Sequence, residues 1–323
     1  HNNPISELYR SKDDYQKNLR AIGDMFFQWE ITPELRFKTA AGINMRDLHG
    51  RYFTALNPEH GEALSVNTLS EQHFRQDEWS VTNTLNYRNT FGEHSLDVLV
   101  GTEALKQNFK GSQILRTDYL YESPDFYLMS NGAGTPVVSY ASQNSSSIFS
   151  LFATANWSWG GKYGATATVR KDDTSRFARA TSDAVFPSAS AFWLLSNEDW
   201  FDSQVFDVLK LRLSWGELGN QQIGGSNLDV NISDQNEFIA YYNFQGSGLA
   251  SPGATLISKG NPNLTWETMT AMNVAFDMGF FDNKLTAIID VFKNETNGLV
   301  GEDTNKISST AIDSSAPFTN LGS

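Results

Sequence analysis

The stretch Leu209–Asn220 reads LKLRLSWGELGN and has the period of a β-strand. Its odd positions are apolar: Leu209, Leu211, Leu213 and Trp215. Its even positions are charged or small: Lys210, Arg212, Ser214 and Gly216. Side chains on a strand alternate between the two faces of the sheet, so one face of this segment is apolar and the other is polar. The apolar face meets either a dry protein core or lipid.

The same alternation recurs along the chain, and it predicts about ten antiparallel strands. Helical periodicity fits these segments less well than a period of two. The segments are 25–31, 35–44, 81–88, 96–103, 149–159, 163–170, 209–215, 272–278 and 285–291. They group into five predicted hairpins, at about 21–46, 76–110, 147–171, 187–218 and 264–299.

The connections between these strands alternate in length. Short turns lie at 32–34, 91–94, 160–162 and 281–283, and they are built from residues that suit turns. Long polar stretches without a steady period lie at 47–75, 111–146, 172–186 and 219–263. Short periplasmic turns and long extracellular loops are typical of outer-membrane β-barrels. The pattern therefore predicts an all-β, antiparallel transmembrane barrel with lipid against its apolar face.

Composition excludes several other classes. The 323 residues carry a formal net charge of −13, which argues against nucleic acid as a partner. The absence of cysteine from the sequence rules out disulfide frameworks and thiolate chemistry. No run of apolar residues approaches the roughly 18 to 20 that a membrane-spanning helix needs. A mean hydropathy of −0.39 fits a soluble protein and a barrel with a polar lumen equally well.

Aromatic residues gather beside the short turns, as they do where a barrel wall meets the lipid headgroups. The predicted girdle consists of Trp157, Trp159, Tyr163, Trp200, Trp215, Phe280 and Phe281. Ring packing at the ends of hairpins in a soluble protein would produce similar clusters. Three features together favour lipid outside and water inside: the strict alternation within strands, the alternation of short and long connections, and the girdle.

Four segments resemble the barrel of SusC/RagA-type TonB-dependent transporters. They are RKDDTSRF (170–177), FPSASAFWLLSNEDW (186–200), LKLRLSWGELGNQQIG (209–224) and GNPNLTWETMTAMNVAFDMGFFDNKLTAIIDVFKNETNGLV (260–300). The resemblance is specific for 147–300, whereas the earlier half resembles the family through TLNYRNTFGEHSLDVLVGTEA (84–104). One departure is Lys171–Thr174, where the family has D-G-S, and it falls in a predicted loop.

The resemblance implies a 22-stranded barrel in the outer membrane of a gram-negative bacterium, plugged by an N-terminal domain that contacts TonB. It also implies a SusD-like surface lipoprotein as partner and an oligosaccharide or peptide as imported solute. On this reading residues 1–323 are part of the barrel domain, about half of it, and the plug and the remaining strands lie outside the chain. The segment PFTNLGS (317–323) resembles the start of the family's N-x-G repeat.

Two sets of residues are candidates for function. The polar face would place seven charged side chains in the lumen, where they either hold the plug or line the solute path: Arg88, Asp97, Glu103, Arg170, Lys210, Arg212 and Asp290. Plug contact is the more ordinary of these two roles. In the loop 219–263, Tyr241, Tyr242 and Phe244 are candidates for contact with substrate or lipoprotein, because aromatic rings stack on sugars and anchor interfaces. They could equally form a small core of the loop itself.

The sequence offers no catalytic or metal-binding pattern, and we expect neither an enzyme nor a cofactor. His1, His49, His60, His73 and His94 lack the spacing of metal ligands. The carboxylate pairs Asp172–Asp173 and Glu198–Asp199 point to opposite faces if they lie on strands, so we interpret them as solvated loop ends rather than a glycosidase pair. The alternatives to transport are a self-contained β-rich protein that binds carbohydrate or has a structural role in the outer membrane, and, more distantly, a soluble β-rich hydrolase.

Overall fold

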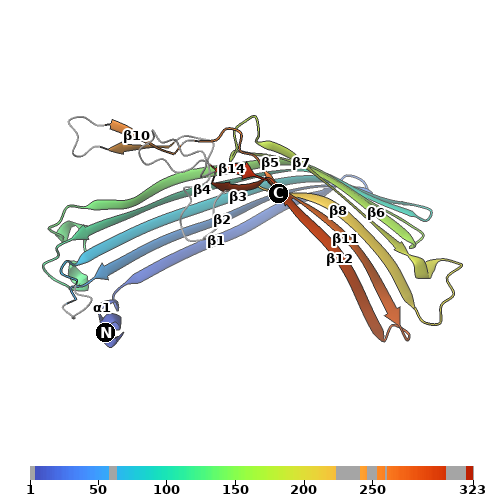
Figure 1. Ribbon diagram of the computed structural model, residues 1–323, viewed down its shortest axis with the longest axis horizontal. Helices are drawn as coiled ribbons and strands as arrows, with labels where there is room; N and C mark the ends of the chain where they lie inside the picture. The colour runs from blue at the N-terminus through green and yellow to red at the C-terminus, as the bar shows by residue number, and fades with distance from the viewer. Residues whose placement is uncertain are drawn as a thin grey trace. The chain divides into compact units, whose positions relative to one another are not determined.

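A computed structural model describes residues 4–57, 64–222, 241–245, 253–258, 260–302 and 318–322. Ten strands form one sheet in the order β1-β2-β3-β4-β5-β6-β7-β8-β11-β12, so nearly every strand lies beside its neighbour in sequence (Figure 1). The bounds are β1 Tyr15–Glu30, β2 Leu35–Thr54, β3 Thr68–Phe91, β4 His94–Thr117, β5 Val137–Trp159, β6 Tyr163–Thr174, β7 Asp183–Leu194, β8 Val208–Asn220, β11 Glu267–Phe280 and β12 Leu285–Asn297. This meander is the arrangement of an up-and-down barrel wall.

The five predicted hairpins and the count of about ten strands in the main sheet are confirmed. Their predicted ends were wrong, because β2 continues to Thr54, β4 to Thr117 and β6 to Thr174, while β3 begins at Thr68 and β5 at Val137. About 9 to 11 tilted residues cross a bilayer. The 24 residues of β3 or β4 therefore reach well beyond it, and the polar end of such a strand has the composition of a loop.

The described residues also contain smaller elements. They are helix α1 (Pro4–Arg10), the 3-10 turns η1 (Pro124–Phe126), η2 (Met129–Asn131) and η3 (Leu195–Asn197), and two small antiparallel sheets. One small sheet pairs β9 (Tyr241–Gln245) with β10 (Gly253–Ser258), and the other pairs β13 (Leu299–Glu302) with β14 (Phe318–Leu321). Within the described residues, no helix is long and apolar enough to cross a bilayer.

The chain divides into two compact units, which we describe separately. Unit 1 comprises His1–Asp24, Gly42–Trp79 and Lys106–Ser145. Its core consists of buried residues from β2, β3 and the segment after β4: Phe53, Ala55, Leu69, Tyr119 and Tyr127. The Phe53 and Tyr127 rings stack at 3.9 Å, and the Asn67 amide bonds both backbone groups of Tyr119. This core ties two loop-side segments together.

Unit 2 comprises Met25–Ala41, Ser80–Leu105 and Ser146–Ser323, and its sheet has two unlike faces. The register aligns Leu211 with Trp193 and Phe276, and Leu213 with Ala191 and Val274. These positions belong to what we call the apolar face, whose side chains stay partly open to the surroundings. Their exposures include Leu85 37%, Leu151 48%, Leu213 45%, Trp215 36%, Val274 44% and Ile289 58%. Soluble proteins rarely leave so many large apolar side chains exposed on one face, so this face is of the kind that suits contact with lipid.

The opposite face of unit 2, which we call the polar face, carries charges and amides together with a few aromatic rings. The rings have a packing role, because Phe152 lies over Gly101 of β4 and Phe192 lies over Gly164 of β6. A Cβ built on Gly164 would be 2.1 Å from Phe192 Cε1, and one built on Gly101 would be 2.5 Å from Phe152 Cζ. An aromatic ring that crosses a strand glycine covers backbone that would otherwise be bare. This explains why Phe152 interrupts the polar face of β5.

The segments that carry the family resemblance meet in a second buried cluster at the loop end of unit 2. Its buried members are Phe177, Phe186, Leu264 and Trp266. The Trp266 ring meets Phe177 and Phe186 edge to face at 5.6 and 5.4 Å, and its indole N–H donates to the Ser182 carbonyl at 3.0 Å. The resembling motifs around these residues therefore build a structural core that joins β7 to the β6–β7 and β8–β11 connections.

Candidate functional site

Ion pairs between strands hold the polar face of unit 2 together. Arg212 on β8 and Asp277 on β11 form a bidentate pair, with Nη2–Oδ1 at 2.7 Å and Nε–Oδ2 at 2.9 Å. On β3 and β4, Arg88 Nε donates to Asp97 Oδ2 at 2.8 Å, and Asn86 Nδ2 donates to Asp97 Oδ1 at 2.6 Å. Parallel donor pairs of this kind are the stronger class of charged hydrogen bond.

Arg170 links three strands on the same face. Its Nη2 atom donates to Glu103 Oε2 on β4 and to Ser150 Oγ on β5, each at 2.7 Å. Its Nε atom donates to Asp172 Oδ1 at 2.7 Å, and the guanidinium lies 5.7 Å from the centre of the Phe152 ring. Ser150 and Asp172 are buried, so this cluster is shielded from water on one side.

Lys210 and Asp290 differ from the other charged candidates. Lys210 lies over the Phe192 ring with its Nζ atom 4.5 Å from the centroid, and no carboxylate among the described residues lies within 4 Å of it. Asp290 on β12 accepts a hydrogen bond from the Asn273 amide and interacts with the charge of Arg212 without a direct ion pair. Lys210 likewise interacts with Asp277, with which it is aligned across the β8–β11 pair. These two side chains differ from the other candidates in making no ion pair within 4 Å among the described residues.

Aromatic rings line the short-turn ends of β4 to β8 in unit 2. His94 packs between Trp157 and Trp159, with ring centroids at 5.9 and 6.0 Å. The series continues through Trp159–Tyr163 at 5.5 Å, Tyr163–Trp193 at 6.2 Å and Trp193–Trp200 at 6.2 Å. A second group joins Phe206, Phe280 and Phe281 at the β11–β12 turn. Rings with one polar end suit the depth of the headgroups.

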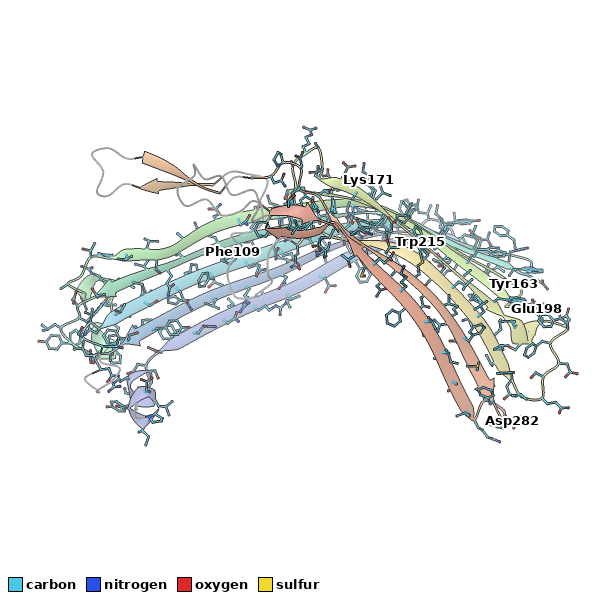
Figure 2. The ribbon with its side chains drawn as sticks, viewed as in Figure 1. Phe109, Tyr163, Lys171, Glu198, Trp215 and Asp282 are labelled. Carbon is cyan, nitrogen blue, oxygen red and sulfur yellow. The ribbon has the colours of Figure 1, made fainter. Side chains whose placement is uncertain are left out.

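Six of the seven predicted girdle residues belong to these two groups. Trp215 is separate, because it lies seven positions along β8 from Val208 and is aligned with Ala189 and Met272. It is on the apolar face, away from the turn ends of the strands (Figure 2). The side chains of Tyr241, Tyr242 and Phe244 lie outside the described residues, although their backbone forms β9.

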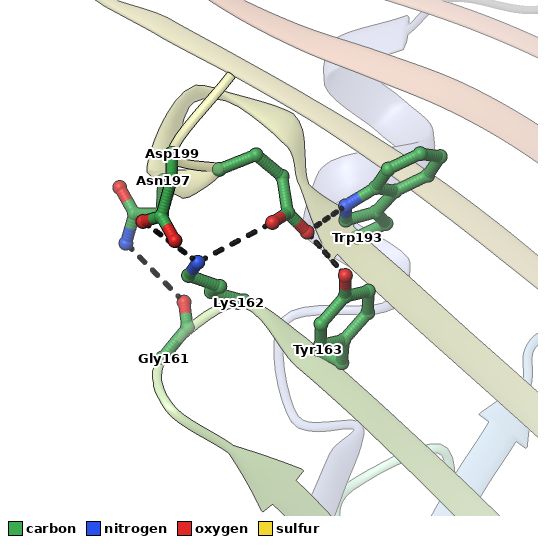
Figure 3. A network of polar contacts seen from close by, with 7 residues as sticks. Gly161, Lys162, Tyr163, Trp193, Asn197 and Asp199 are labelled. Atoms are coloured by element: carbon green, nitrogen blue, oxygen red, sulfur yellow. Dashed lines mark hydrogen bonds and ion pairs between the residues drawn. The ribbon is translucent and has the colours of Figure 1, made fainter. Parts of the chain in front are cut away.

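A polar network fastens the segment after β7 to the β5–β6 turn (Figure 3). Glu198 accepts hydrogen bonds from the Tyr163 hydroxyl and, at 2.9 Å, from Trp193 Nε1. Lys162 Nζ lies 3.3 Å from Glu198 Oε2 and 3.2 Å from Asp199 Oδ1, and Asn197 donates to the Gly161 carbonyl at 3.4 Å. The pKa of Glu198 is lowered, chiefly by the hydrogen bond that it accepts from Tyr163. The pKa of Lys162 is raised, chiefly by its hydrogen bond to Asp199.

The interpretation of the carboxylate pairs as solvated loop ends was wrong for one member of each pair. The Glu198 side chain is 9% exposed and pairs with Lys162, and the Asp172 side chain is 10% exposed and pairs with Arg170. Asp173 and Asp199 are exposed, with the Asp199 side chain at 98%. Neighbours in sequence therefore point apart, as expected, and neither pair converges on one bond.

Sequence reasoning missed three participants: Asp277, Trp193 and His94. Asp277 lies on the polar face of the 272–278 pattern, but alternation gives the face of a residue and not its partner across the sheet. Trp193 stands within FPSASAFWLL, where its aromatic character and turn-proximal position were available signals. His94 was assigned to a turn, whereas it begins β4. Among the described residues, no three His, Asp or Glu side chains could hold a metal ion.

Comparison with known proteins identifies the family of β-barrel to which this sheet belongs. A family model described as "TonB dependent receptor-like, beta-barrel" matches residues 2–323. The TonB-dependent receptor SusC of Bacteroides thetaiotaomicron is 30% identical over 308 residues, which are 92% of this chain and 29% of that protein. The TonB-dependent receptor P3 of Formosa agariphila is 27% identical over 302 residues, 90% of this chain and 28% of that protein. The chain thus spans less than a third of the length of these relatives.

Solved structures agree on the fold. The RagAB peptide importer in its open-open state has a TM-score of 0.80 at 22% identity, covering 95% of this chain and 32% of that one. The ferric citrate transporter FecA has a TM-score of 0.51 at 13% identity, covering 92% of this chain and 37% of that one. At these identities the likeness establishes the barrel architecture.

Proposed function

Because the chain belongs to the TonB-dependent receptor β-barrel family, we propose that it forms part of the wall of an importer in the outer membrane of a gram-negative bacterium. The imported solute is a glycan or peptide fragment. A SusD-like surface lipoprotein delivers it, and TonB supplies energy through a plug domain encoded outside these 323 residues. The protein catalyses no reaction and needs no cofactor.

The observation that carries this proposal is the pair of unlike faces on one sheet. An exposed apolar face suits contact with lipid, and a polar face held by ion pairs suits a water-filled lumen. The relatives point the same way, because SusC is called a TonB-dependent receptor and RagAB a peptide importer. Neither name fixes the solute of this protein.

The charges on the polar face divide into two roles under this proposal. Arg88, Asp97, Glu103, Arg170 and Arg212 hold the wall together, since each has a partner within it. Lys210 and Asp290 make no direct ion pair within 4 Å among the described residues, although each interacts with an opposite charge nearby, so we assign them to contact with the plug or the solute. This assignment narrows the seven sequence candidates to two.

The test is uptake by cells that produce the complete protein together with its neighbouring lipoprotein. Labelled oligosaccharides and labelled peptides are supplied separately, in cells with and without TonB. We expect accumulation of one solute class that stops when TonB is removed. Lys210→Ala should reduce uptake, while Lys293→Ala, an exposed lysine of the same sheet, should not. Uptake of neither class, or uptake that persists without TonB, contradicts the proposal.

A further inference from the structure

The apolar face of unit 2 contains a groove of about 810 Å³. Its floor is made of alanines that neighbour one another across three strands: Ala155, Ala165, Ala167, Ala189 and Ala191. Its walls are large side chains, Trp157 on β5 and Leu213 and Trp215 on β8. Small residues between large ones make a depression in a surface that is otherwise ridged, and the groove opens on the face that meets lipid.

The turn end of the groove changes from apolar to charged within a few residues. Two positions beyond Ala165 and Ala191 lie Tyr163 and Trp193, whose rings stack at 6.2 Å. Their hydroxyl and indole N–H groups both donate to Glu198 (Figure 3). Lys162 contacts the same Glu198 and also Asp199. The profile of the site is therefore apolar, then aromatic, then charged, which is the profile of a phospholipid from chains to headgroup.

The charges at this end favour one kind of headgroup. Lys162 contacts two carboxylates, of which Glu198 is 9% exposed and Asp199 is 98% exposed. The network thus carries one excess negative charge, and its accessible part is the Asp199 carboxylate. An ammonium group is attracted there, while the Lys162 ammonium stands beside it to receive a phosphate. An anionic headgroup without an amine would meet net repulsion.

We propose that this groove binds one aminophospholipid of the periplasmic leaflet. Its acyl chains occupy the alanine floor between Trp157 and Trp215, its ammonium group pairs with Asp199, and its phosphate lies beside Lys162. The leaflet follows from the position of the short turns, which are periplasmic in this class of barrel. The inference rests on the placement of the barrel in the membrane and not on the import of any solute.

Native mass spectrometry of the complete protein tests the proposal. The protein is stripped of lipid in detergent and titrated with palmitoyl-oleoyl phosphatidylethanolamine or, separately, with the matching phosphatidylglycerol. Lipids that bind the barrel surface without specificity give a series of adducts whose number rises gradually with lipid concentration. We expect one phosphatidylethanolamine adduct to saturate before this series appears. Phosphatidylglycerol should show only the gradual series.

Two variants with matched controls separate the groove from its rim. Ala189→Leu fills the floor and should reduce the single adduct several-fold, whereas Ala287→Leu, on the apolar face of β12 away from the groove, should not. Asp199→Asn should remove the preference for phosphatidylethanolamine, whereas Asp282→Asn at another short turn should keep it (Figure 2). Folding is checked by the faster migration of unheated barrel on a denaturing gel, and Asp199→Asn tests the site even if Ala189→Leu fails to fold.

Three outcomes overturn the proposal. Equal adducts in the Ala189→Leu and Ala287→Leu proteins would show that the groove holds no particular lipid. A preference for phosphatidylglycerol would contradict the headgroup assignment. A dimer mass that disappears with Ala189→Leu would assign the groove to a second copy of the chain. Uptake measurements do not enter this test, so its failure is distinct from failure of the import proposal.

Discussion

Arg212 and Asp277 lie on neighbouring strands of the polar face and are joined by a bidentate pair, although they are 65 residues apart in sequence. Their side chains are 39% and 27% exposed. The pair fixes the register of β8 against β11 across the inserted segment between them. It also pairs two charges that would otherwise be left open on the polar face, so its role is structural as well as electrostatic.

A double-mutant cycle at this pair measures that role. Arg212→Ala and Asp277→Ala should each lower the unfolding temperature of the purified barrel, and the double variant should lose less than the sum of the two. The control cycle uses Arg36 and Glu30, whose side chains are 51% and 65% exposed and joined by a single contact at 3.2 Å. We expect a larger coupling at Arg212–Asp277, because geometry there is bidentate and less open to water. Equal couplings would show that register is set elsewhere.

The Glu198 network makes stability at the short-turn end of the sheet depend on pH. Its hydrogen bonds, with that from Tyr163 first, hold the pKa of Glu198 below its ordinary value of 4.5. A carboxylate whose pKa is lower when folded contributes stability above the ordinary value, and this is lost as the pH falls through the folded pKa. The pKa of Lys162 is raised above its ordinary value of 10.5, chiefly by the hydrogen bond to Asp199. Its contribution to the stability of the folded state is therefore fully present below 10.5 and is lost as the pH rises through the folded pKa.

Glu198→Gln isolates the acid side of this dependence. Glutamine keeps an acceptor for Tyr163 and Trp193 but cannot titrate, so the variant should lose less stability than the parent protein between pH 5 and pH 3, a window of roughly two units around the carboxylate's ordinary pKa. Unfolding temperature as a function of pH is the measurement. Glu93→Gln, at another short turn, should keep the parent's profile. Parallel profiles for Glu198→Gln and the parent would remove Glu198 from the acid transition.

The aromatic cover of Gly164 predicts a steric effect. A Cβ at this position would lie 2.1 Å from Phe192, so Gly164→Ala forces the ring away and should cost about 1–3 kcal/mol, the usual range for overpacking. Adding Phe192→Ala should relieve part of that cost, which a thermal unfolding series would show. In Gly23→Ala the new Cβ meets only Ile43 at 3.8 Å, an ordinary contact, and little change is expected. A large loss at Gly23 and none at Gly164 would contradict this account.

Sequence alternation predicted the faces of the sheet better than its contacts. Leu213 and Trp215 lie on the exposed apolar face and Lys210 and Arg212 on the other, because a period of two is enough to assign a face. Pairing Arg212 with Asp277 and Arg170 with Glu103 required the register, which alternation alone does not give. Strand ends were missed at 47–54, 68–75, 111–117 and 137–146, because these segments lack a steady alternation of apolar and polar residues.

The motif residues were visible in the sequence but their task was not. RKDDTSRF and GNPNLTWE resembled a transporter family, and the structure shows that Phe177, Leu264 and Trp266 from these motifs pack together. Nothing in a linear pattern says that segments about 90 positions apart share one core. The same limit applies to Glu198, whose burial depends on Tyr163 and Trp193 from two other strands.

Asn320 gives the last prediction, because its amide ties β14 to the loop-end cluster. Its Nδ2 atom donates to the Thr265 carbonyl at 2.9 Å and to the Gly298 carbonyl at 2.8 Å, and its Oδ1 atom accepts from the Thr265 amide at 3.0 Å. Asn320→Ala removes all three bonds and leaves partly buried backbone groups without those partners. We expect a loss of about 2–3 kcal/mol in the free energy of unfolding, from roughly 1 kcal/mol for each hydrogen bond.

The contrast with an exposed asparagine shows whether this loss is specific. Asn294→Ala on β12 changes an exposed side chain and should leave the unfolding free energy within about 0.5 kcal/mol of the parent. Hydrogen exchange gives a second, local readout, because the amides of Val300 and Thr265 should exchange faster in Asn320→Ala while those of β6 do not. Asn320→Asp preserves the acceptor but turns an oxygen toward the Thr265 and Gly298 carbonyls in place of the two donors, so it should be at least as destabilising as the alanine variant. An aspartate variant as stable as the parent would mean that the Nδ2 bonds do not hold β14 in place.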